Sequence, residues 1–299
     1  MSDAPPEFRA GFAALVGRPN VGKSTLLNAL VGQKLSIVTP RPQTTRHRVL
    51  GLVHLPTAQI AFVDTPGLHL GAKRALNRAM NRTASTALAD ADLVLLVVEA
   101  TRYTDEDELA LQRVRDSGRP ALLVVNKVDQ VQPRELVLPY IQLMAQRHSF
   151  ADVVPVSAHK SDNLETLKQV IAKLLPVSPP LFAQTDLTDR DLNFRIAETI
   201  REKLTLELNQ EVPYGIAVEI ERLAREDGRL AVSAVIWVDR EGQKPIVIGP
   251  KGARLKRVGT AARYEINTMT AERTHLELWV KVREDWADNA QALRALGLE

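Results

Sequence analysis

The chain has 299 residues, which is long for one ordinary domain and suits two. It is 45% hydrophobic and 25% charged, an ordinary soluble composition, and the absence of cysteine excludes disulfides and thiolate metal sites. Residues 1–9 lack the apolar core of a signal peptide, and no apolar run approaches the ~18 residues of a membrane span. We therefore expect a cytoplasmic protein.

Short apolar runs alternate with helical patterns over the first 175 residues. Runs of this kind are typical of strands buried on both faces, and their alternation with helices predicts an α/β fold with a doubly wound, mostly parallel six-stranded sheet. The predicted strands are 12–16, 60–63, 93–98, 121–125 and 153–156, with an additional edge strand at 48–55. The predicted helices are 23–31, 74–88, 105–117, 133–148 and 163–175.

The pattern changes after Pro176, Pro179 and Pro180, which predict a linker or hinge. The later elements predict a smaller α+β domain. They are a helix at 189–209, strands at 214–223 and 230–239, a short strand at 245–248, a helix at 253–271, a strand at 274–282 and a terminal helix at 284–296. The expected boundaries are a disordered 1–10, a first domain 11–178, a linker 179–188 and a second domain 189–299.

The first motif is the phosphate-loop pattern G-x-x-x-x-G-K-[ST], between a predicted strand and a predicted helix. Its glycines let the backbone approach phosphate oxygens at a helix N-terminus. Lys23 would reach the β- and γ-phosphates, and the Ser24 hydroxyl would bind Mg²⁺. The alternative is a glycine-rich turn without a ligand. The candidate nucleotide-binding residues of this loop are Gly17, Asn20, Val21, Gly22, Lys23, Ser24 and Thr25.

Two further motifs follow later predicted strands. Asp64 begins D-T-P-G and can hold Mg²⁺, usually through water, while the Gly67 amide can contact a γ-phosphate. Alone, D-T-P-G is a turn signal.

The sequence Asn126-Lys127-Val128-Asp129 identifies the base, because a carboxylate accepts two hydrogen bonds from guanine and adenine offers no such pair of donors. Asn126 would tie loops together, and the stem of Lys127 would cover one ring face.

A fourth motif, Ser157-Ala158, places an amide where it can contact the guanine O6. The four motifs in this order resemble those of the P-loop GTPases, over roughly residues 11–178. The resemblance implies a threonine that binds Mg²⁺, for which the segment 36–46 offers Thr39, Thr44 and Thr45. We favour Thr45, because Thr-Thr-Arg resembles the corresponding motif of bacterial ribosome- and tRNA-associated GTPases.

Leu68 follows the D-x-x-G motif, where Ras-like GTPases have a glutamine that orients the attacking water. Leucine has no donor or acceptor, so the chain resembles the GTPases with a hydrophobic residue here, and intrinsic hydrolysis should be slow. Members of that group can use a K⁺ ion held partly by an asparagine at the position of Asn20. This resemblance predicts faster hydrolysis in K⁺ than in Na⁺, a difference lost in Asn20→Ala. Equal rates in both salts would contradict it.

The second domain carries G-x-x-G between an apolar run and a basic helix. In KH domains such a loop clamps about four nucleotides of single-stranded RNA. The helix–strand–strand–loop–helix–strand order resembles the type II KH arrangement, with Ile246, Val247, Ile248 and Leu255 as a groove floor. The alternative is an ordinary tight turn before a helix. The candidate RNA-binding residues are Ile248, Gly249, Pro250, Lys251, Gly252, Arg254, Lys256 and Arg257.

The charge is distributed unevenly along the chain. Residues 242–264 contain no Asp or Glu, yet residues 181–299 together carry 18 Lys and Arg against 20 Asp and Glu. A focused basic groove with acidic surroundings fits this count better than a broadly basic surface. We therefore expect RNA binding through one face, with a moderate dependence on salt.

Together the motifs resemble those of the Era family of bacterial GTPases over nearly the whole chain. That resemblance implies slow, Mg²⁺-dependent conversion of GTP to GDP, a monomer, and binding to single-stranded 16S rRNA near its 3′ end during assembly of the 30S ribosomal subunit. It assigns catalysis to Lys23, Thr45, Asp64 and Gly67. The alternatives are a second domain that docks on protein or membrane, with peripheral contact at the inner face of the cell membrane, and a constitutive RNA-binding protein with weak nucleotide regulation.

Overall fold

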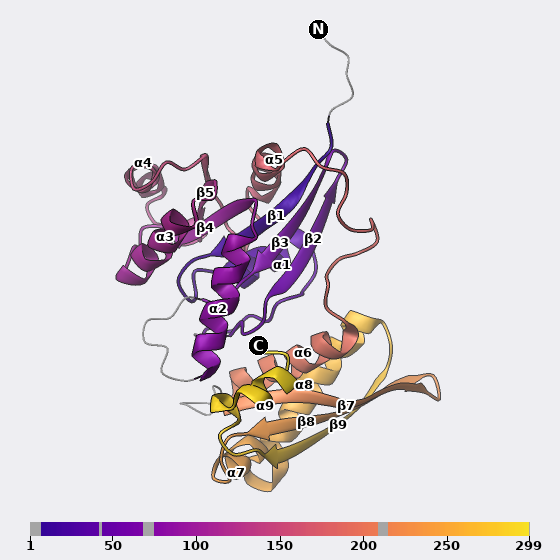
Figure 1. The fold of residues 1–299 in the computed structure, drawn as a ribbon. Coiled ribbons are helices and arrows are strands. Elements are labelled where there is room, and N and C mark those ends of the chain that lie inside the picture. Colours follow the sequence, from indigo (N-terminus) through magenta and orange to yellow (C-terminus); the bar gives the residue numbers. More distant parts are fainter. Residues whose placement is uncertain (1–6, 42–43, 68–74, 209–214, 299) are drawn as a thin grey trace. The chain divides into compact units, whose positions relative to one another are not determined.

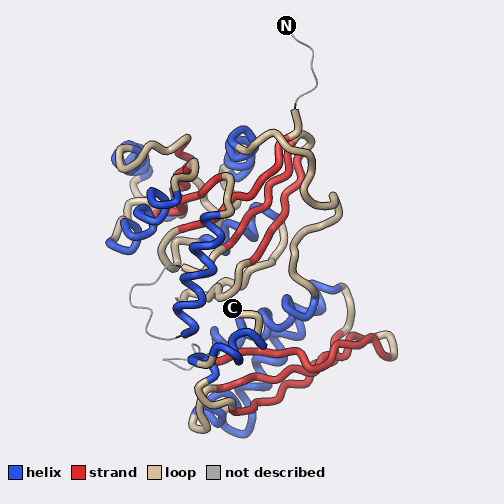
Figure 2. Tube along the Cα trace, viewed as in Figure 1, coloured by secondary structure: helices blue, strands red, loops and turns tan. Residues whose placement is uncertain are grey.

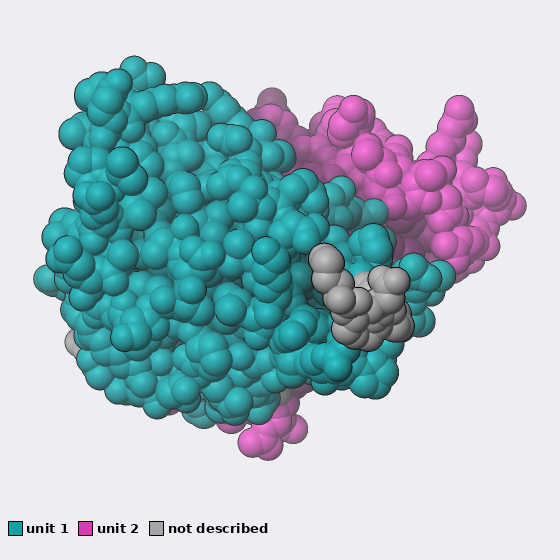
Figure 3. All heavy atoms as spheres, turned by 90° about the horizontal axis from the view of Figure 1, so that it is seen from above, with its two compact units in different colours: residues 1–36, 45–72, 80–189 teal, residues 37–44, 73–79, 190–299 magenta. Residues whose placement is uncertain are grey.

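The computed structural model describes residues 7–41, 44–67, 75–208 and 215–298. They divide into two units, coloured separately in Figure 3. Unit 1 consists of residues 1–36, 45–72 and 80–189, and unit 2 of residues 37–44, 73–79 and 190–299. Both units are thus built from several segments, whereas the predicted domains are continuous in sequence.

Unit 1 contains a six-stranded sheet in the order β2-β3-β1-β4-β5-β6, and every neighbouring pair is parallel except β2 with β3 (Figures 1 and 2). The predicted fold class and the additional edge strand predicted at 48–55 are confirmed, and this strand is antiparallel to its neighbour. The strands are β1 Arg9–Val16, β2 Val49–Leu55, β3 Ala58–Asp64, β4 Leu93–Glu99, β5 Ala121–Asn126 and β6 Asp152–Pro155.

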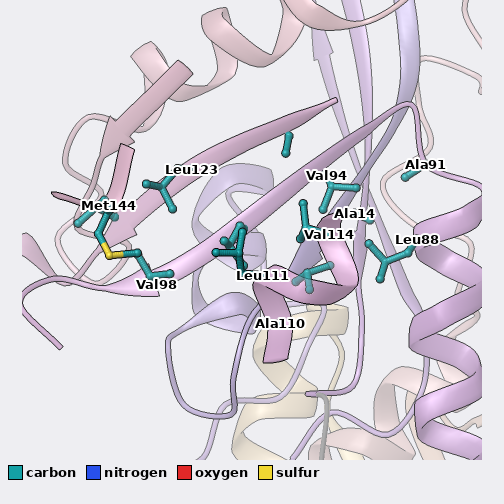
Figure 4. Packing of buried hydrophobic residues seen from close by; sticks show 14 of the residues in the cluster. Ala14, Leu88, Ala91, Val94, Val98, Ala110, Leu111, Val114, Leu123 and Met144 are labelled. Carbon is teal, nitrogen blue, oxygen red and sulfur yellow. The ribbon is translucent and has the colours of Figure 1, made fainter. Parts of the chain in front are cut away.

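Helices cover both faces of this sheet, because almost every strand residue is apolar and must be buried on either side. On one face lie α1 Lys23–Val31 and α5 Leu164–Leu174. On the other, α2 Ala75–Ala89, α3 Asp105–Ser117 and α4 Val137–Ala145 enclose a core of aliphatic side chains (Figure 4). Residues of this core labelled in the figure include Ala14, Val94, Val98, Leu111, Leu123 and Met144.

Two predictions for unit 1 are wrong in detail. Disorder over 1–10 is wrong for Arg9 and Ala10, which lie in β1 and pair with β3; residues 1–6 are outside the described residues. The helix expected over 133–148 begins only at Val137, after a single 3₁₀ turn. A start at 133 would have placed Pro139 in the helix interior, where its missing N–H and its ring are not tolerated.

The segment expected as a linker, 179–188, is hydrogen-bonded to the sheet of unit 1. The buried side chain of Gln59 accepts the N–H groups of Leu181 and Phe182. Further along, the backbone N–H of Leu52 in β2 donates to the carbonyl of Leu187 at 2.9 Å. This segment therefore covers the free edge of β2.

Unit 2 contains a three-stranded sheet, β7 Ile216–Glu226, β8 Arg229–Val238 and β9 Thr274–Val282, in that order. Helices α6 Leu192–Glu207 and α8 Ala253–Thr270 contribute to one apolar core with the strands (Figure 1). The β9 strand shows the expected alternation of exposed and less exposed residues, because one sheet face meets the helices and the other meets solvent.

The short strand predicted over 245–248 is wrong, because this segment is helix α7 Gln243–Ile248. Pro245 has no N–H for a strand ladder but fits the first turn of a helix. Val247 points into the core, whereas Ile246 is exposed, so the expected apolar groove floor is only partly formed by these residues. The terminal helix is also shorter than predicted: Trp286 is buried in a 3₁₀ turn before α9 Ala290–Ala295.

Candidate nucleotide and RNA sites

The phosphate loop joins β1 to α1 and approaches other backbone so closely that its glycines are required. A Cβ added at Gly17 would lie 2.3 Å from the carbonyl oxygen of Val97. At Gly22 the backbone is left-handed, with φ 100°, and a Cβ would lie 2.5 Å from Nδ2 of Asn126. Any larger residue at either position would push the loop away from its neighbours.

Lys23 is the first residue of α1, and its side chain is buried inside this loop. The ammonium donates to the carbonyls of Gly17 at 2.9 Å and Arg18 at 3.0 Å. Burial lowers the pKa of Lys23 to about 8, because the charged form has lost its hydration. A phosphate group beside it would add negative charge and favour the protonated ammonium.

Three side chains from separate motifs meet beside Lys23. The hydroxyl of Ser24 donates to Oδ2 of Asp64 at 2.7 Å and lies 2.8 Å from the hydroxyl of Thr45. The Thr45 hydroxyl is itself 3.4 Å from the same carboxylate oxygen. Burial raises the pKa of Asp64, since the carboxylate is fully enclosed.

This cluster fits a hard divalent cation. Hydroxyl and carboxylate oxygens are the ligands that Mg²⁺ takes in phosphate sites. The second oxygen of Asp64, Oδ1, is buried and has no hydrogen-bond partner within the described structure. A buried carboxylate oxygen in this state can accept a hydrogen bond from a metal-bound water.

The other two threonine candidates lie in a different arrangement. The hydroxyls of Thr39 and Thr44 are 2.5 Å apart, and Thr44 also donates to the carbonyl of Arg41. Both hydroxyls are therefore engaged within their own segment, and among the three candidates only Thr45 contacts Ser24 and Asp64. Gly67 lies against the loop, since a Cβ added there would be 3.2 Å from Cγ of Pro19. Leu68 lies outside the described residues.

The predicted base-binding residues lie where β5 ends. Asn126 donates from Nδ2 to the carbonyl of Val21 at 2.9 Å, and its Oδ1 accepts the N–H of Ala158 at 3.0 Å. One side chain thus connects the phosphate loop to the loop after β6. Asp129 stands in a 3₁₀ turn, and its Oδ1 is buried without a hydrogen-bond partner in the described part of the chain. That oxygen suits the paired donors of guanine.

The Ala158 amide differs from its predicted role in one respect. Its N–H already donates to Asn126, so contact with a guanine O6 would require sharing the hydrogen between two acceptors. Ser157 stabilises the turn that presents it, because its hydroxyl accepts the N–H of Lys160 at 3.1 Å.

The G-x-x-G loop of unit 2 connects α7 to α8. Gly249, Lys251 and Gly252 all have left-handed φ, at 75°, 49° and 76°. A Cβ at Gly249 would lie 2.7 Å from Cβ of Arg254, whereas one at Gly252 would meet nothing within 4 Å. The loop therefore exposes backbone at the N-terminus of an 18-residue helix, which is a favourable place for phosphate.

The predicted RNA-binding side chains do not all face solvent equally. Lys251 and Lys256 are exposed and have no ion-pair partner within the described residues. Arg254 instead donates to the carbonyl of Ile246, and Arg257 forms an ion pair with Glu207 at 2.9 Å. The two lysines are thus the cations most available to a nucleic acid, beside Ile248 and Pro250 of the same loop.

Sequence reasoning missed two groups of buried charges. In unit 1, Arg18 is paired with Glu99 and Asp107. In unit 2, Glu198, Arg201 and Glu202 lie on a buried face of α6. For the second group the sequence pattern was misleading. These charges lie on the helix face opposite the apolar residues Ile196, Ile200 and Leu204, and a charged face of that kind normally meets solvent.

Comparison with known proteins identifies a family for each of the two parts of the chain. Residues 12–127 match the family described as 50S ribosome-binding GTPase, and residues 211–287 match the KH domain family. A relative named GTPase Era, from Stenotrophomonas maltophilia (strain K279a), is 49% identical over 299 residues, 100% of both chains. The chain belongs to the Era family of GTPases. Another GTPase Era, from Marinobacter nauticus, is 47% identical over 293 residues, 98% of this chain and 96% of that one.

Two solved Era structures match the whole fold. A variant of Aquifex aeolicus Era bound to GDP·AlF4⁻ has a TM-score of 0.93 and 40% identity, covering 97% of this chain and 99% of that one. An Era complex with MgGDPNP and nucleotides 1506–1542 of 16S ribosomal RNA has a TM-score of 0.93 and 41% identity, with the same coverage. The predicted type II KH arrangement follows α6-β7-β8-α7-α8-β9, with α7 in place of the expected short strand.

Proposed function

We propose that this protein is a GTP-hydrolysing switch that binds a single-stranded segment near the 3′ end of 16S rRNA and assists assembly of the 30S subunit. The buried oxygens of Asp64 and Asp129 supply acceptors for a metal-bound water and for guanine. One related Era structure holds GDP·AlF4⁻, and another holds MgGDPNP together with nucleotides 1506–1542 of 16S ribosomal RNA.

In this proposal, different residues of unit 1 bind the phosphates, the base and the metal ion of the GTP complex. Lys23 and the loop amides bind the β- and γ-phosphates, and Asn126, Lys127 and Asp129 bind the base. Ser24 and Thr45 would hold Mg²⁺, with Asp64 acting through water, and the ion would supply positive charge beside the phosphates. No side chain beside the γ-phosphate is assigned as a general base, and hydrolysis should be slow without a partner.

The observation that carries the switch is the position of residues 37–44. This segment belongs to unit 2, although Thr45, the next residue, contacts Ser24 and Asp64 in unit 1. The backbone N–H of Val38 donates to Glu202 of α6 at 2.9 Å, and Arg201 of α6 donates to the carbonyl of Thr44. A change in the nucleotide would therefore reach α6 through a chain of neighbouring bonds.

Such coupling needs contacts that differ between the GTP and GDP states. Thr45 supplies one, since a ligand of Mg²⁺ at the γ-phosphate loses part of its site after hydrolysis. On α6, the buried ion pair between Glu198 and Arg201, at 2.6 Å, holds in place the arginine that donates to the carbonyl of Thr44. Segment 37–44 lies between these two points.

Replacing Thr45 with alanine should weaken binding of the GTP analogue GDPNP about tenfold in the presence of Mg²⁺ and leave GDP affinity nearly unchanged. The removed hydroxyl contributes roughly 1–2 kcal/mol as one polar contact to a charged group. Titration with fluorescent nucleotides measures both affinities. Thr44→Ala is the matched control, because its hydroxyl bonds only within the 37–44 segment. Equal losses in the two variants would remove Thr45 from the metal site.

The switch itself is tested by RNA affinity in the two nucleotide states. With a fragment of the 16S rRNA 3′ end, the wild type should bind more tightly with GDPNP than with GDP, by a factor in the range of about 5–150 that typical coupling energies give. The double variant Glu198→Gln/Arg201→Met should bring this ratio close to one. Removing both partners together avoids leaving one buried charge uncompensated.

The matched control is Arg225→Met/Glu272→Gln. This arginine–glutamate pair lies in the same unit, is solvent-exposed and is held by two hydrogen bonds of 2.9 Å. The ratio should be unchanged in the control. A wild-type ratio of one would favour a constitutive RNA-binding protein, and no RNA binding in either state would favour a second domain that docks on protein or membrane.

Within the described residues, no helix is both long enough and apolar enough to cross a membrane. We propose that the protein acts as a monomer on ribosomal precursors in the cytoplasm. Peripheral contact with the inner face of the cell membrane stays an alternative, which co-sedimentation with anionic vesicles would reveal.

A further inference from the structure

The second residue of the phosphate-loop pattern, Arg18, has a side chain that turns away from the loop into the protein. Its Nη2 lies 2.5 Å from Oε2 of Glu99, and its Nε lies 2.9 Å from Oδ2 of Asp107. Its backbone carbonyl accepts the ammonium of Lys23. One residue therefore connects the lysine of the phosphate site to the ends of β4 and α3.

Glu99 continues this connection to the base-binding loop. The oxygen that pairs with Arg18, Oε2, is also 3.2 Å from Nζ of Lys127. Burial acts to raise the pKa of Glu99, but the hydrogen bonds from Arg18 and Lys127 outweigh it and lower the pKa. Glu99 is thus ionised and shared between two cations, one from each half of the nucleotide site.

This arrangement is a poor source of stability. Asp107 is completely buried, and its Oδ1 has no hydrogen-bond partner within the described structure. Desolvation of buried charges offsets much of their attraction, so apolar side chains of similar size would stabilise the fold as well. The network instead restricts the conformation of the long Lys127 side chain, because Glu99 holds its ammonium group.

The position matters for the base. Lys127 has an uncommon left-handed φ of 64°, and its ammonium is directed to Glu99. The stem of a lysine held at its far end lies across the place expected for one face of the guanine ring. A lysine without this ion pair would lose side-chain conformational entropy when the nucleotide binds, which would weaken binding. A lysine that is already held by Glu99 loses less entropy at that step.

We propose that Glu99 is a positioning residue for guanine recognition, acting through Lys127, and that Arg18 keeps the Glu99 carboxylate in place. The inference rests on the proposed function only in taking a guanine nucleotide as the ligand. It goes beyond that function in joining the phosphate half and the base half of the site through one carboxylate oxygen.

A double-mutant cycle on GDP affinity tests the proposal. Glu99→Gln should weaken GDP binding about 3- to 10-fold, the range expected when a long side chain must be ordered on binding. Lys127→Met alone should also weaken GDP binding. In the Lys127→Met background, Glu99→Gln should then have no further effect, because no ammonium is left to position. Displacement of a fluorescent GDP measures all four dissociation constants.

The control is Glu108→Gln on α3. This glutamate is paired with Arg115 at 2.9 Å, outside the Arg18 network, and the change should leave GDP affinity as it is in the wild type. If Glu99→Gln unfolds the protein, Glu99→Asp is the replacement variant, since it keeps the charge near Arg18 but is one methylene too short for Lys127. It should show the same dependence on Lys127.

Two outcomes overturn the proposal: an unchanged GDP affinity in Glu99→Gln, or the same loss in the presence and absence of the Lys127 ammonium. The second would mean that Glu99 acts on the loop or on folding rather than on the base. A wild type that binds no guanine nucleotide would overturn the proposed function instead, so the two failures are distinguishable.

Discussion

Replacing Asp129 with asparagine is expected to exchange guanine for xanthine as the preferred base. The carboxylate offers two acceptors to the N1 and N2 donors of guanine, and one of its oxygens is buried without a hydrogen-bond partner among the described residues. Asparagine keeps one acceptor and places an NH₂ donor where the second was. That donor opposes the guanine amino group but matches the C2 carbonyl of xanthine.

The expected loss of GTP affinity is large. Losing one hydrogen bond to a charged group costs about 1.5–3 kcal/mol, and leaving the guanine amino group opposed by another donor costs about 1–3 kcal/mol. Together these losses correspond to roughly 10²- to 10⁴-fold in affinity. Competition between GTP and XTP for the Asp129→Asn variant measures the exchange. Asp162→Asn is the matched control, because this aspartate is exposed in the neighbouring loop and only its backbone bonds to Ser157. Retained GTP preference in Asp129→Asn would contradict the assignment of the base site.

Replacing Gly252 with aspartate should abolish most RNA binding while the protein stays folded. A Cβ at this position meets nothing within 4 Å, and aspartate tolerates the left-handed φ of 76° better than most residues. Gly252 immediately precedes the first turn of α8, where the helix dipole favours a negative charge. The aspartate carboxylate would stand where phosphate should approach the loop, beside Lys251.

Two like charges 4 Å apart repel by about 1 kcal/mol in bulk water and by about 4 kcal/mol near a protein surface, where the effective dielectric constant is lower. This range corresponds to roughly a 5- to 10³-fold loss of RNA affinity. Gly252→Asn is the control, because asparagine adopts the same backbone conformation without the charge. Fluorescence anisotropy with a short single-stranded RNA measures the three proteins. Equal binding by the aspartate and asparagine variants would mean that phosphate does not approach this loop, and GTP hydrolysis without RNA should be the same in all three.

Most elements of the fold could be predicted because local pattern and tertiary environment agree. The buried strands of unit 1 are continuous apolar runs, and α1 and α3 begin and end where the sequence indicates. The errors in secondary structure arose where the local sequence was compatible with two kinds of element. Pro245 precedes Ile-Val-Ile, and these β-branched residues favour a strand by propensity. In the structure only Val247 of the three is buried in the core, and one face of a short helix is enough to bury it.

The candidate site was predictable where its chemistry is encoded in contiguous residues, and not where it depends on side chains far apart in the sequence. The motifs give the phosphate loop, Asp64, Asn126 and Asp129 directly. Nothing in the sequence shows that Glu99 lies between Arg18 and Lys127, since 81 residues separate Arg18 from Glu99. The choice of Thr45 over Thr39 and Thr44 likewise rested on resemblance, and the structure adds the contact with Ser24 and Asp64 that spacing cannot give.

The segment that follows the helices of unit 1 has a consequence for how that unit behaves when isolated. The backbone of Leu52 donates outward to Leu187, and that of Leu50 to the carboxylate of Asp189, so residues 187–189 occupy the side of β2 that has no neighbouring strand. A fragment ending at Ser178 would expose that row of N–H and C=O groups. Exposed strand edges pair with other chains, so such a fragment should self-associate, whereas one that extends past Asp189 carries its own cover.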